Sequence, residues 1–307
     1  MSEVSIIGGI TADIEGHPYN RLIHGDSNPG KISISYGGVG RNIVENLARL
    51  GNKVNFISVA GDDLPGRGAV RELQDLGVDV EHVRLLPEEN TAVYMSILNL
   101  IGDMELAMCN MDVLERISAP FIEEALGQIK KSHVVGLDTN LTEDTLEYVT
   151  RQLENIPIFL DPVSAAKAER ARKVIGRFHA VKPNRMEAEV ISGLSILSEQ
   201  DLKDAARWFM DQGVRQVFIT LGGGGVFYMD EKEEGLVRPN PMEIVSVTGA
   251  GDAFSAAVIH GIISGFEIGK TARLGMAAAA VAMQAKSAVN NQISMDKLRQ
   301  KLGWDAL

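Results

Sequence analysis

The sequence has little cysteine, little positive charge and no long apolar run, and each shortage excludes a class of protein. Its one cysteine, Cys109, cannot form an internal disulfide, which is typical of proteins from a reducing cytosol. Because 30 Lys and Arg residues stand against 41 Asp and Glu residues, the net charge of −11 argues against nucleic acid or an anionic membrane as a partner. The longest apolar stretch, residues 274–283, is about half the length of a membrane span. We therefore expect a cytoplasmic protein that binds neither membrane nor nucleic acid.

The composition itself is that of an ordinary globular protein, with 45% hydrophobic and 23% charged residues. Its 307 residues are enough for one large α/β domain or for two smaller domains. Strands are predicted at residues 4–9, 54–59, 78–85, 132–137, 156–160, 179–181, 216–220 and 226–229. Helices are predicted at 68–76, 143–153, 186–192, 201–212, 253–264, 270–285 and 295–302, besides one that begins within 37–42 and ends before 51. This alternation predicts a mainly parallel sheet covered by helices on both faces.

Two regions interrupt this alternation and predict a small second sheet. Ile32 and Ile34 alternate with two serines, which indicates a half-buried strand. Gly102-Asp103 separates two apolar segments and is the strongest hairpin signal in the chain. Because no helix lies between these strands, we expect residues of about 14–36 and 92–112 to form an accessory sheet, inserted into a single domain that spans residues 1–307.

Polar motifs directly follow several of the predicted strands. They comprise Asp13 and the segments 37–42, 161–162, 182–184 and 220–225. Ligands of open α/β sheets bind beyond the carboxyl ends of the strands, so we expect these motifs to surround one site. The glycines at 37–40 match neither a Walker A loop nor the Gly-x-Gly-x-x-Gly fingerprint, which excludes an NAD-dependent dehydrogenase. They fit either a polyhydroxylated ligand beside Asn42 or a tight turn between a strand and a helix.

Residues 248–254 combine a tight turn with the start of a helix. The turn is Thr248-Gly-Ala-Gly251, and an apolar helical pattern begins at Ala253. Unpaired N–H groups at a helix N-terminus favour an anion, including one that forms during phosphoryl transfer. Asp252, within the turn, could accept a proton from a substrate hydroxyl. Taken alone, the segment fits a capped helix as well; together with the other motifs it predicts a phosphoryl-transfer site.

Two further motifs are typical of a nucleotide site and also have plainer interpretations. Asn184 and Glu187 share one face at the start of a helix, where an amide oxygen and a carboxylate suit Mg²⁺. The same pair fits a helix cap. The run Gly222–Gly225 could wrap the phosphates of a nucleotide or form a flexible β-turn.

The order of these motifs resembles the PfkB/ribokinase family, and the resemblance covers essentially the whole chain. The motifs that carry it are residues 37–42, 182–187, 220–226 and 248–254. It implies a kinase with a ribokinase-like three-layer α/β/α domain, a mainly parallel central sheet and a small β-sheet lid. Within the family, residues 26–32, 37–46, 89–91 and 161–164 are most similar to bacterial pseudouridine kinases. That similarity implies ATP-dependent phosphorylation of the 5′ hydroxyl of pseudouridine. The alternatives are a ribokinase or another nucleoside or sugar kinase and, more distantly, a non-catalytic nucleoside sensor.

The resemblance also implies roles for individual residues on the side of the acceptor. Asp252 matches the catalytic base, and Gly249, Ala250 and Gly251 match the anion hole. Asp13, Gly38 and Asn42 match the ribose contacts. No motif fixes the contacts to a base; the candidates in or near the lid are Asn28, Lys31, Thr91 and Asn110, each of which could equally be an ordinary polar residue of a loop or strand.

On the side of ATP, the resemblance implies contacts to phosphates, metal and adenine. Thr220, Gly222 and Gly225 match the phosphate contacts, Asn184 and Glu187 match a motif that holds Mg²⁺ and phosphate through water, and Ala277–Ala280 match the surroundings of the adenine.

The sequence departs from the family pattern at two positions. Thr11 stands where many members have an asparagine that contacts the ribose. Ser246 stands where many have an aspartate that helps to bind a monovalent cation, so activation by K⁺ is left open. No cluster of Lys and Arg accompanies Asp13 or Asn42, which favours an uncharged sugar or nucleoside over a sugar phosphate.

The accessory sheet also bears on assembly. Its apolar residues include Val93, Ile97, Leu98 and Leu106, and open sheet edges pair readily with a second copy. We therefore expect a homodimer through the lid. Cys109, which lies in an apolar run of this region, is expected to pack against apolar neighbours rather than to act as a nucleophile.

Overall fold

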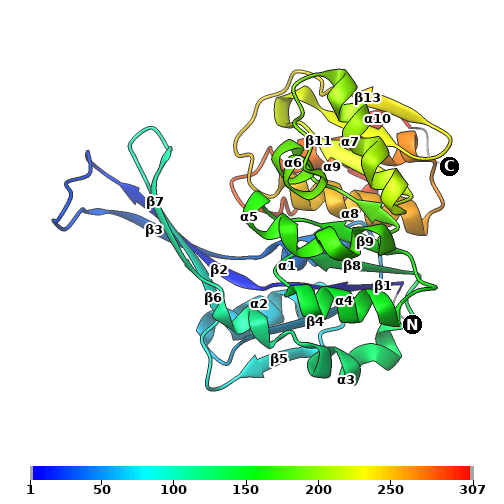
Figure 1. Ribbon diagram of the computed structural model, residues 1–307. Coiled ribbons are helices and arrows are strands. Elements are labelled where there is room, and N and C mark those ends of the chain that lie inside the picture. The colour runs from blue at the N-terminus through cyan, green and yellow to red at the C-terminus, as the bar shows by residue number, and fades with distance from the viewer. Residues whose placement is uncertain (1–2, 305–307) are drawn as a thin grey trace.

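Two β-sheets organise the chain over residues 3–304, the part that the computed structural model describes (Figure 1). The larger sheet contains β1 (Val4–Ile7), β4 (Val54–Gly61), β5 (Val83–Leu86), β8 (Val134–Asp138), β9 (Ile158–Asp161), β10 (Ala180–Val181), β11 (Gln216–Thr220), β12 (Val226–Met229) and β13 (Glu234–Val237). The strand order is β13-β12-β11-β10-β9-β8-β1-β4-β5. Neighbouring strands run parallel, except that β12 is antiparallel to both of its neighbours, β11 and β13.

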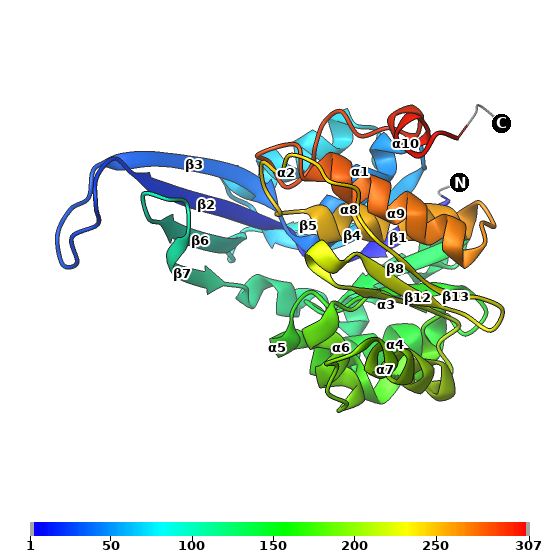
Figure 2. The same ribbon diagram turned by 90° about the horizontal axis from the view of Figure 1, so that it is seen from above.

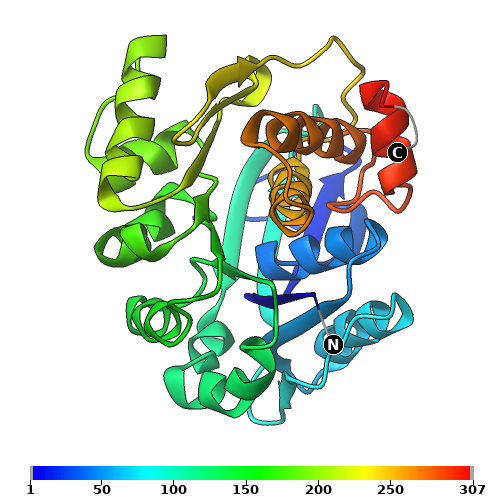
Figure 3. The same ribbon diagram turned by 90° about the vertical axis from the view of Figure 1, so that its right-hand side faces the viewer.

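Helices cover both faces of this sheet (Figure 3). They are α1 (Val39–Arg49), α2 (Leu64–Asp75), α3 (Ala119–Ile129), α4 (Glu143–Gln152), α5 (Ala165–Ala168), α6 (Arg185–Ser192), α7 (Glu199–Gln212), α8 (Ala250–Ile263), α9 (Ile268–Ala282) and α10 (Met295–Leu302), with 3-10 helices η1 (Asp112–Arg116), η2 (Glu169–Arg177) and η3 (Gly222–Gly224). One apolar core joins the sheet to α3, α4, η2, α6 and α7, and a second joins it to α1, α2, α8, α9 and α10. The predicted three-layer α/β/α arrangement is confirmed.

The central strand β1 shows why both faces are covered. Its residues alternate between the two cores: Ile7 belongs to one core, and Val4 and Ile6 belong to the other. Such a strand is apolar on both faces, which is typical of a buried parallel sheet. Because neighbouring strands run parallel, the carboxyl ends of β1, β8, β9, β10 and β11 meet along one edge. Among the described residues, no helix is long and apolar enough to cross a bilayer.

The accessory sheet projects from the body (Figures 1 and 2). It contains β2 (Thr11–Pro18), β3 (Gly30–Gly37), β6 (Ala92–Leu98) and β7 (Met104–Asn110) in the order β3-β2-β6-β7. In the register of its strands, Ile14 lies opposite both Ile34 and Met95, and Met95 lies opposite Met108. These side chains share one face, which we call the apolar face.

The other face of the accessory sheet is polar. Asp13 lies opposite Tyr94, and Tyr94 lies opposite Cys109, so these three residues form a row across β2, β6 and β7. We call this the polar face. Helix α2 packs beside the apolar face, where the Tyr36 hydroxyl reaches the backbone of Gly68. Helix α5 lies on the opposite side of the base of the sheet (Figure 1).

Several expectations about single elements were wrong. Ile32 and Ile34 are 71% and 65% exposed rather than half-buried, and Cys109 is exposed rather than packed. The reason is common to all three: the sheet stands clear of the body, so neither face is covered along most of its length. Strand β5 is shorter than predicted, because residues 78–82 contribute only the isolated bridge between Asn55 and Asp79. Six elements were not predicted: α3, α5, β13 and the 3-10 helices η1, η2 and η3.

Candidate active site

The first turn of α8 is open toward the carboxyl edge of the sheet. Gly249 precedes the helix with φ of 76°, and a Cβ at this position would lie 1.7 Å from the carbonyl oxygen of Ala288. Only glycine therefore fits. Because glycine has no side chain, no side-chain cap accepts from the N–H groups of the first turn. These groups, at the positive end of the helix dipole, remain available to an anion.

Asp252 lies in this first turn, half-buried, and is bonded to the start of α1. Asn42 Nδ2 donates to Asp252 Oδ2 at 2.8 Å, so two residues that are 210 positions apart meet at one point. Burial, aided by the Asp161 carboxylate, raises the pKa of Asp252 to about 7 against the opposing effects of Asn42 and Lys182. A carboxyl group with a pKa near neutrality is suited to accept a proton from a hydroxyl.

The start of α1 is held by a residue that the sequence did not reveal. Asp138, at the end of β8, is buried, and its Oδ2 accepts from the N–H groups of Gly40 at 2.9 Å and Gly9 at 3.1 Å. Its Oδ1 accepts from the N–H of Asn140 at 2.8 Å. Helix α1 has no side-chain cap of its own, because Gly38 occupies that position. Asp138 thus caps α1 from the neighbouring strand and fixes Asn42 relative to Asp252.

Replacing Asp138 with alanine is expected to lower the free energy of unfolding by about 3 kcal/mol, because three buried N–H groups lose their acceptor. Urea unfolding at neutral pH measures the change. Asp211→Ala, at an exposed position near the end of α7, is the matched control and should change the free energy by less than about 0.5 kcal/mol. Equal effects of the two substitutions would contradict the anchoring role of Asp138.

Asp13 lies on the polar face, close to the turn at Gly37. A Cβ at Gly37 would be 2.0 Å from Asp13 Oδ2, so the glycine makes room for the carboxylate. Thr11 Oγ1 donates to Asp13 Oδ1 at 2.8 Å. The departure from the family pattern at Thr11 therefore places a hydroxyl that orients Asp13. Burial raises the pKa of Asp13, while the bond from Thr11 opposes that change.

A buried ion pair lies beneath the first turn of α8. Lys182, at the end of β10, has its Nζ 3.1 Å from Asp161 Oδ2, and Ser255 Oγ donates to the same oxygen at 2.7 Å. The same Nζ is 3.3 Å from the position of a Cβ on Gly251. Burial opposes the charge of Lys182, but the carboxylates of Asp161, Glu187 and Asp252 outweigh it and raise the pKa of Lys182. The site thus contains a fixed positive charge, to which the sequence assigned no role.

Asn184 and Glu187 form a reciprocal capping box at the start of α6. Asn184 Oδ1 accepts from the Glu187 N–H at 2.9 Å, and the Glu187 carboxylate accepts from the Asn184 N–H at 2.8 Å. The structure therefore contains the helix cap that was one of the two interpretations of this pair. Glu187 is buried, and burial raises its pKa. Thr220 lies beside this cap, since Asn184 forms a parallel bridge with it. Among residues 3–304, no cluster of three or more His, Cys, Asp or Glu could hold a metal on its own.

The glycine run after β11 forms a tight loop with an open backbone. Gly225 has φ of 98°, and a Cβ there would lie 2.0 Å from the carbonyl oxygen of Val237, so the position requires glycine. Nothing lies within 4 Å of the corresponding positions at Gly222 and Gly223. A ligand could approach the backbone there. Ala277 and Ala280, on α9, are both buried, and Ala277 belongs to the second core.

The four candidates for contacts to a base are not brought together. The Thr91 side chain is buried and donates to Asp63 Oδ1 at 2.5 Å. Asn28 and Asn110 accept backbone N–H groups of their own loops, those of Ile23 and Asp112. Lys31 lies opposite His17 on the polar face, near the exposed end of the accessory sheet. Ser246 Oγ likewise accepts from the N–H of Thr248, at 3.2 Å.

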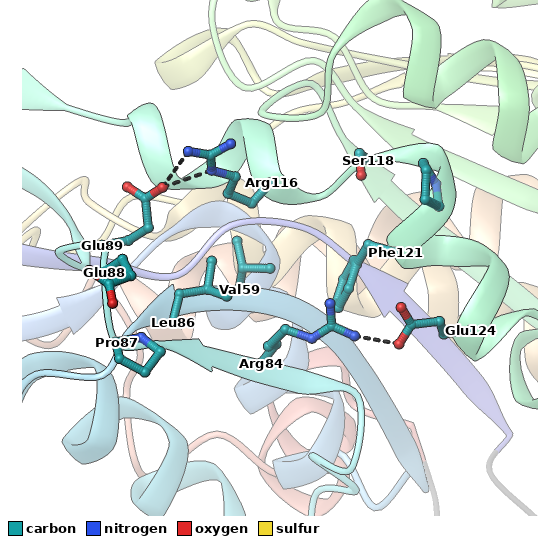
Figure 4. A pocket seen from close by; sticks show the side chains of 11 residues that line it. Val59, Arg84, Leu86, Pro87, Glu88, Glu89, Arg116, Ser118, Phe121 and Glu124 are labelled. Atoms are coloured by element: carbon teal, nitrogen blue, oxygen red, sulfur yellow. Dashed lines mark hydrogen bonds and ion pairs between the residues drawn. The ribbon is translucent and has the colours of Figure 1, made fainter.

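Two hollows lie outside this cluster of motifs. One of about 970 Å³ is bounded by β3, α1, α2 and residues 287–289. The other, of about 320 Å³, lies between β5, η1 and α3, as Figure 4 shows. There Arg116 forms an ion pair with Glu89, which joins the segment before β6 to the segment after β7 (Figure 4). The residues lining these hollows do not include Asp13 or Asp252.

Comparisons with known proteins identify the family and the fold of the chain. Residues 1–294 match the family described as "pfkB family carbohydrate kinase". The chain is 34% identical over 293 residues to a pseudouridine kinase of Escherichia coli (strain K12), covering 95% of this chain and 94% of that one. It is 29% identical over 285 residues to a guanosine-inosine kinase of Exiguobacterium acetylicum, covering 91% and 94% of the two chains. The structure of Arabidopsis thaliana ribokinase complexed with ribose and ATP superposes with a TM-score of 0.90 at 20% identity, covering 99% of each chain, which confirms the ribokinase-like fold. The chain belongs to the pfkB family of carbohydrate kinases, phosphotransferases that act on a hydroxyl group, as the order of its motifs predicts.

Proposed function

We propose that this kinase transfers the γ-phosphoryl group of ATP to the 5′ hydroxyl of a ribose-containing nucleoside, with pseudouridine as the first candidate. The observation that carries the proposal is the 2.8 Å hydrogen bond between Asn42 and Asp252 at the open first turn of α8. The bond supports a role for Asp252 as the base, with Asn42 beside it as a ligand for hydroxyl groups and the open first turn of α8 as a site for an anion. The similarity to a pseudouridine kinase supports the choice of nucleoside.

The proposed reaction needs positioning and charge stabilisation rather than a covalent intermediate. Asp13 and Asn42 bind the ribose hydroxyls, and Asp252 accepts the 5′ proton. As the bond from the 5′ oxygen to the γ-phosphorus forms, the bond from that phosphorus to the β–γ bridging oxygen breaks, and ADP leaves. The N–H groups at Gly249, Ala250 and Gly251, which have no side-chain cap, would donate to the transferring group, and the ammonium group of Lys182 lies close to Gly251.

The residues present fit ATP and Mg²⁺. Thr220 and the open backbone of Gly222 and Gly225 suit the phosphates, with Asn184 beside Thr220. Ala277–Ala280 are small enough to leave room for an adenine. Glu187, already bonded to the Asn184 N–H, would hold Mg²⁺ through water and phosphate oxygens. When bound, the ion neutralises charge on the phosphates.

Glu187→Gln is expected to raise the Mg²⁺ concentration needed for half-maximal turnover by up to about 10-fold, because it removes a charge that orients the waters of the metal. The measurement is turnover against Mg²⁺ at fixed ATP. Glu199→Gln, which removes an exposed partner of Arg238, is the control. An unchanged titration in Glu187→Gln would count against the metal role.

The acceptor is tested by ATP consumption with pseudouridine, uridine, adenosine, ribose and fructose 6-phosphate. We expect the highest kcat/KM with pseudouridine. A preference for ribose would overturn the nucleoside assignment while leaving the kinase assignment intact. Phosphorylation of none of these compounds would support the non-catalytic sensor instead. Repeating the assay with K⁺ replaced by Na⁺ tests the cation site, where Ser246 supplies no charge and we expect little difference.

We further propose that two copies of the chain pair through the apolar face. Ile32, Ile34 and Met108 on this face are 71%, 65% and 65% exposed, an unusual arrangement for a monomer. Val93, Ile97 and Leu106 extend the same face, and the edge strands β3 and β7 lie along its two sides. Most soluble oligomers pair the same surface of two identical chains, so a second copy of this chain is the partner that we propose for the apolar face.

Ile34→Asp is expected to convert the dimer into a monomer at micromolar concentration, because a charge on the apolar face cannot be buried without a partner. Light scattering after size-exclusion chromatography measures the mass. Ser33→Asp, one residue away on the polar face, is the matched control and should leave the mass unchanged. A monomeric parent chain, or a dimer that persists in Ile34→Asp, would contradict this interface.

A further inference from the structure

A buried arginine stands directly before Asn42, in the segment 37–42 whose other side has been assigned to the acceptor. Arg41, on α1, is 4% exposed and borders the larger hollow between α1 and α2. Its Nη1 is 2.7 Å from Glu45 Oε2, and its Nη2 is 2.9 Å from Glu72 Oε2. The guanidinium group therefore joins α1 to α2.

Stability alone does not explain an arginine at this position. Removing the charges of Arg41 and Glu45 from water costs free energy that a buried ion pair regains only in part. Among residues 3–304, Arg41 Nε has no hydrogen-bond partner, which adds to that cost. A buried polar group that is retained with an unpaired donor calls for an explanation from function.

A third contact of Arg41 leads to the proposed base. Nη1 also donates to Asn42 Oδ1 at 3.3 Å, and Asn42 Nδ2 donates to Asp252 Oδ2 at 2.8 Å. The two ends of the amide thus have opposite partners, a guanidinium group at the oxygen and a carboxyl group at the nitrogen. A flipped amide would turn its NH₂ group against the guanidinium group, where donor meets donor. Arg41 therefore opposes the flip.

This opposition matters most when Asp252 carries a proton. An ionised carboxylate can only accept, so it holds the NH₂ group of Asn42 without help. A protonated carboxyl group can also donate, and it could bond to the oxygen of a flipped amide. Because burial raises the pKa of Asp252 to about 7, both forms are present near neutrality. Arg41 is the partner that keeps the amide in the same orientation in both.

We propose that Arg41 is a positioning residue for phosphoryl transfer, which fixes the Asn42 amide with its nitrogen toward Asp252 and so favours the form of Asp252 that accepts a proton. This role rests on the proposed function of Asp252 as the base, but on no particular nucleoside. The charge of Arg41 acts in the same sense on Asp13, where it opposes the rise in pKa that burial causes.

Other charged groups act on Asp252 from the ends of three strands. Asp161 and Asp138 raise its pKa, and Lys182 lowers it. All three are left in place by the substitutions that test Arg41. A change in the ionisation of Asp252 in those variants therefore reports the hydrogen bond from Asn42.

The test is Arg41→Lys, which keeps the positive charge beside Glu45 and removes the fork that reaches Asn42. We expect the inflection of kcat/KM against pH to move up by about 0.5 to 1 unit, because a weaker bond from Asn42 leaves the pKa of Asp252 higher. As a result, kcat/KM should fall about 3- to 10-fold at pH 6 and stay within about 3-fold of the parent at pH 9.

Arg49→Lys is the matched control, because Arg49 belongs to the same helix and the same ion-pair network. Its Nε donates to Glu45 Oε1 at 2.8 Å, but its other partner is the carbonyl oxygen of Asn291, at 3.1 Å, rather than Asn42. We expect the inflection of this variant to match that of the parent. Equal shifts in the two variants would show that the network only holds the fold, and would overturn the inference. An unmoved inflection in Arg41→Lys would overturn it as well.

Carbon NMR titration of the Asp252 carboxyl group, assigned by its loss in Asp252→Asn, keeps this inference separate from the proposed function. If the parent has a flat pH profile, the role of Asp252 as the base fails, and the titrations of Arg41→Lys and Arg49→Lys still decide the role of Arg41. If Arg41→Lys does not fold, the Arg41→Met, Glu45→Met double variant replaces the buried pair with apolar side chains. It should show the same upward shift, and its absence there would contradict the positioning role.

Discussion

Asp252→Asn is expected to lower kcat by about 10²- to 10⁴-fold, the range for loss of a positioned general base, while the chain still folds and binds nucleoside. The amide keeps the size of the side chain and an oxygen that can accept from Asn42 Nδ2, so the geometry at the first turn of α8 persists. Steady-state kinetics with calorimetric titration of the nucleoside separate turnover from binding. Asp211→Asn, exposed on α7, is the control.

The pH dependence of the parent chain follows from the same residue. Burial raises the pKa of Asp252 to about 7. At that pH the carboxyl group is protonated in half of the molecules, which therefore cannot accept a proton from the substrate. We expect kcat/KM, which reports ionisations of the free enzyme, to rise with pH up to about 7 and then to level off. A flat profile from pH 5 to pH 8, or near-native turnover in Asp252→Asn, would contradict the assignment.

The same raised pKa has an opposite consequence for stability. The folded pKa lies above the unfolded value of 3.8, so the folded chain binds the proton more tightly. Stability therefore decreases as pH rises from about 4 to about 7, and the loss is complete above pH 7. Asp252→Asn removes this ionisation, and we expect its melting temperature to exceed that of the parent at pH 8 but not at pH 4. A carboxylate retained at the expense of stability is typical of a functional site.

Local sequence was sufficient to find Asp252 and Asn42, because both lie in glycine-rich turns that begin helices. The glycines are required where backbone segments meet, as at Gly249 against Ala288. The alternation of strands and helices likewise predicted the parallel sheet, since an apolar strand must be covered on both faces. Sequence could not show which surfaces of the projecting sheet are covered. The alternation at Ile32 and Ile34 therefore predicted the strand correctly, but the prediction that these residues are half-buried was wrong.

The residues that sequence missed act across the sheet rather than along the chain. Asp138 accepts from Gly40, 98 positions earlier, and Ser255 reaches Asp161, 94 positions earlier. No local pattern marks such a partner, because only the order of the strands brings it into place. The sequence likewise could not show that the hydroxyl of Thr91, a candidate for contacts to a base, donates to Asp63 Oδ1. Most polar side chains in loops satisfy nearby groups in this way.

Lys182→Met is expected to lower kcat by about 100-fold, a loss comparable with removal of one donor to a developing anion. Lys182 Nζ is 3.1 Å from Asp161 and 3.3 Å from the Cβ position of Gly251, so its charge acts on the first turn of α8. It also opposes the rise in the pKa of Asp252. Its removal should therefore move the inflection of kcat/KM to higher pH.

The same substitution leaves Asp161 buried without its cationic partner, which is expected to lower the free energy of unfolding by about 3–5 kcal/mol. The Lys182→Met, Asp161→Asn double variant separates the two effects, because it also removes the orphaned carboxylate and Ser255 can still donate to the amide oxygen. We expect it to regain most of the stability measured by urea unfolding and little of the lost kcat. Lys203→Met, which breaks an exposed pair with Glu234, is the control and should change neither quantity. If the double variant regained kcat together with stability, Lys182 would serve only to hold the fold, and the positive charge beneath α8 would have no part in phosphoryl transfer.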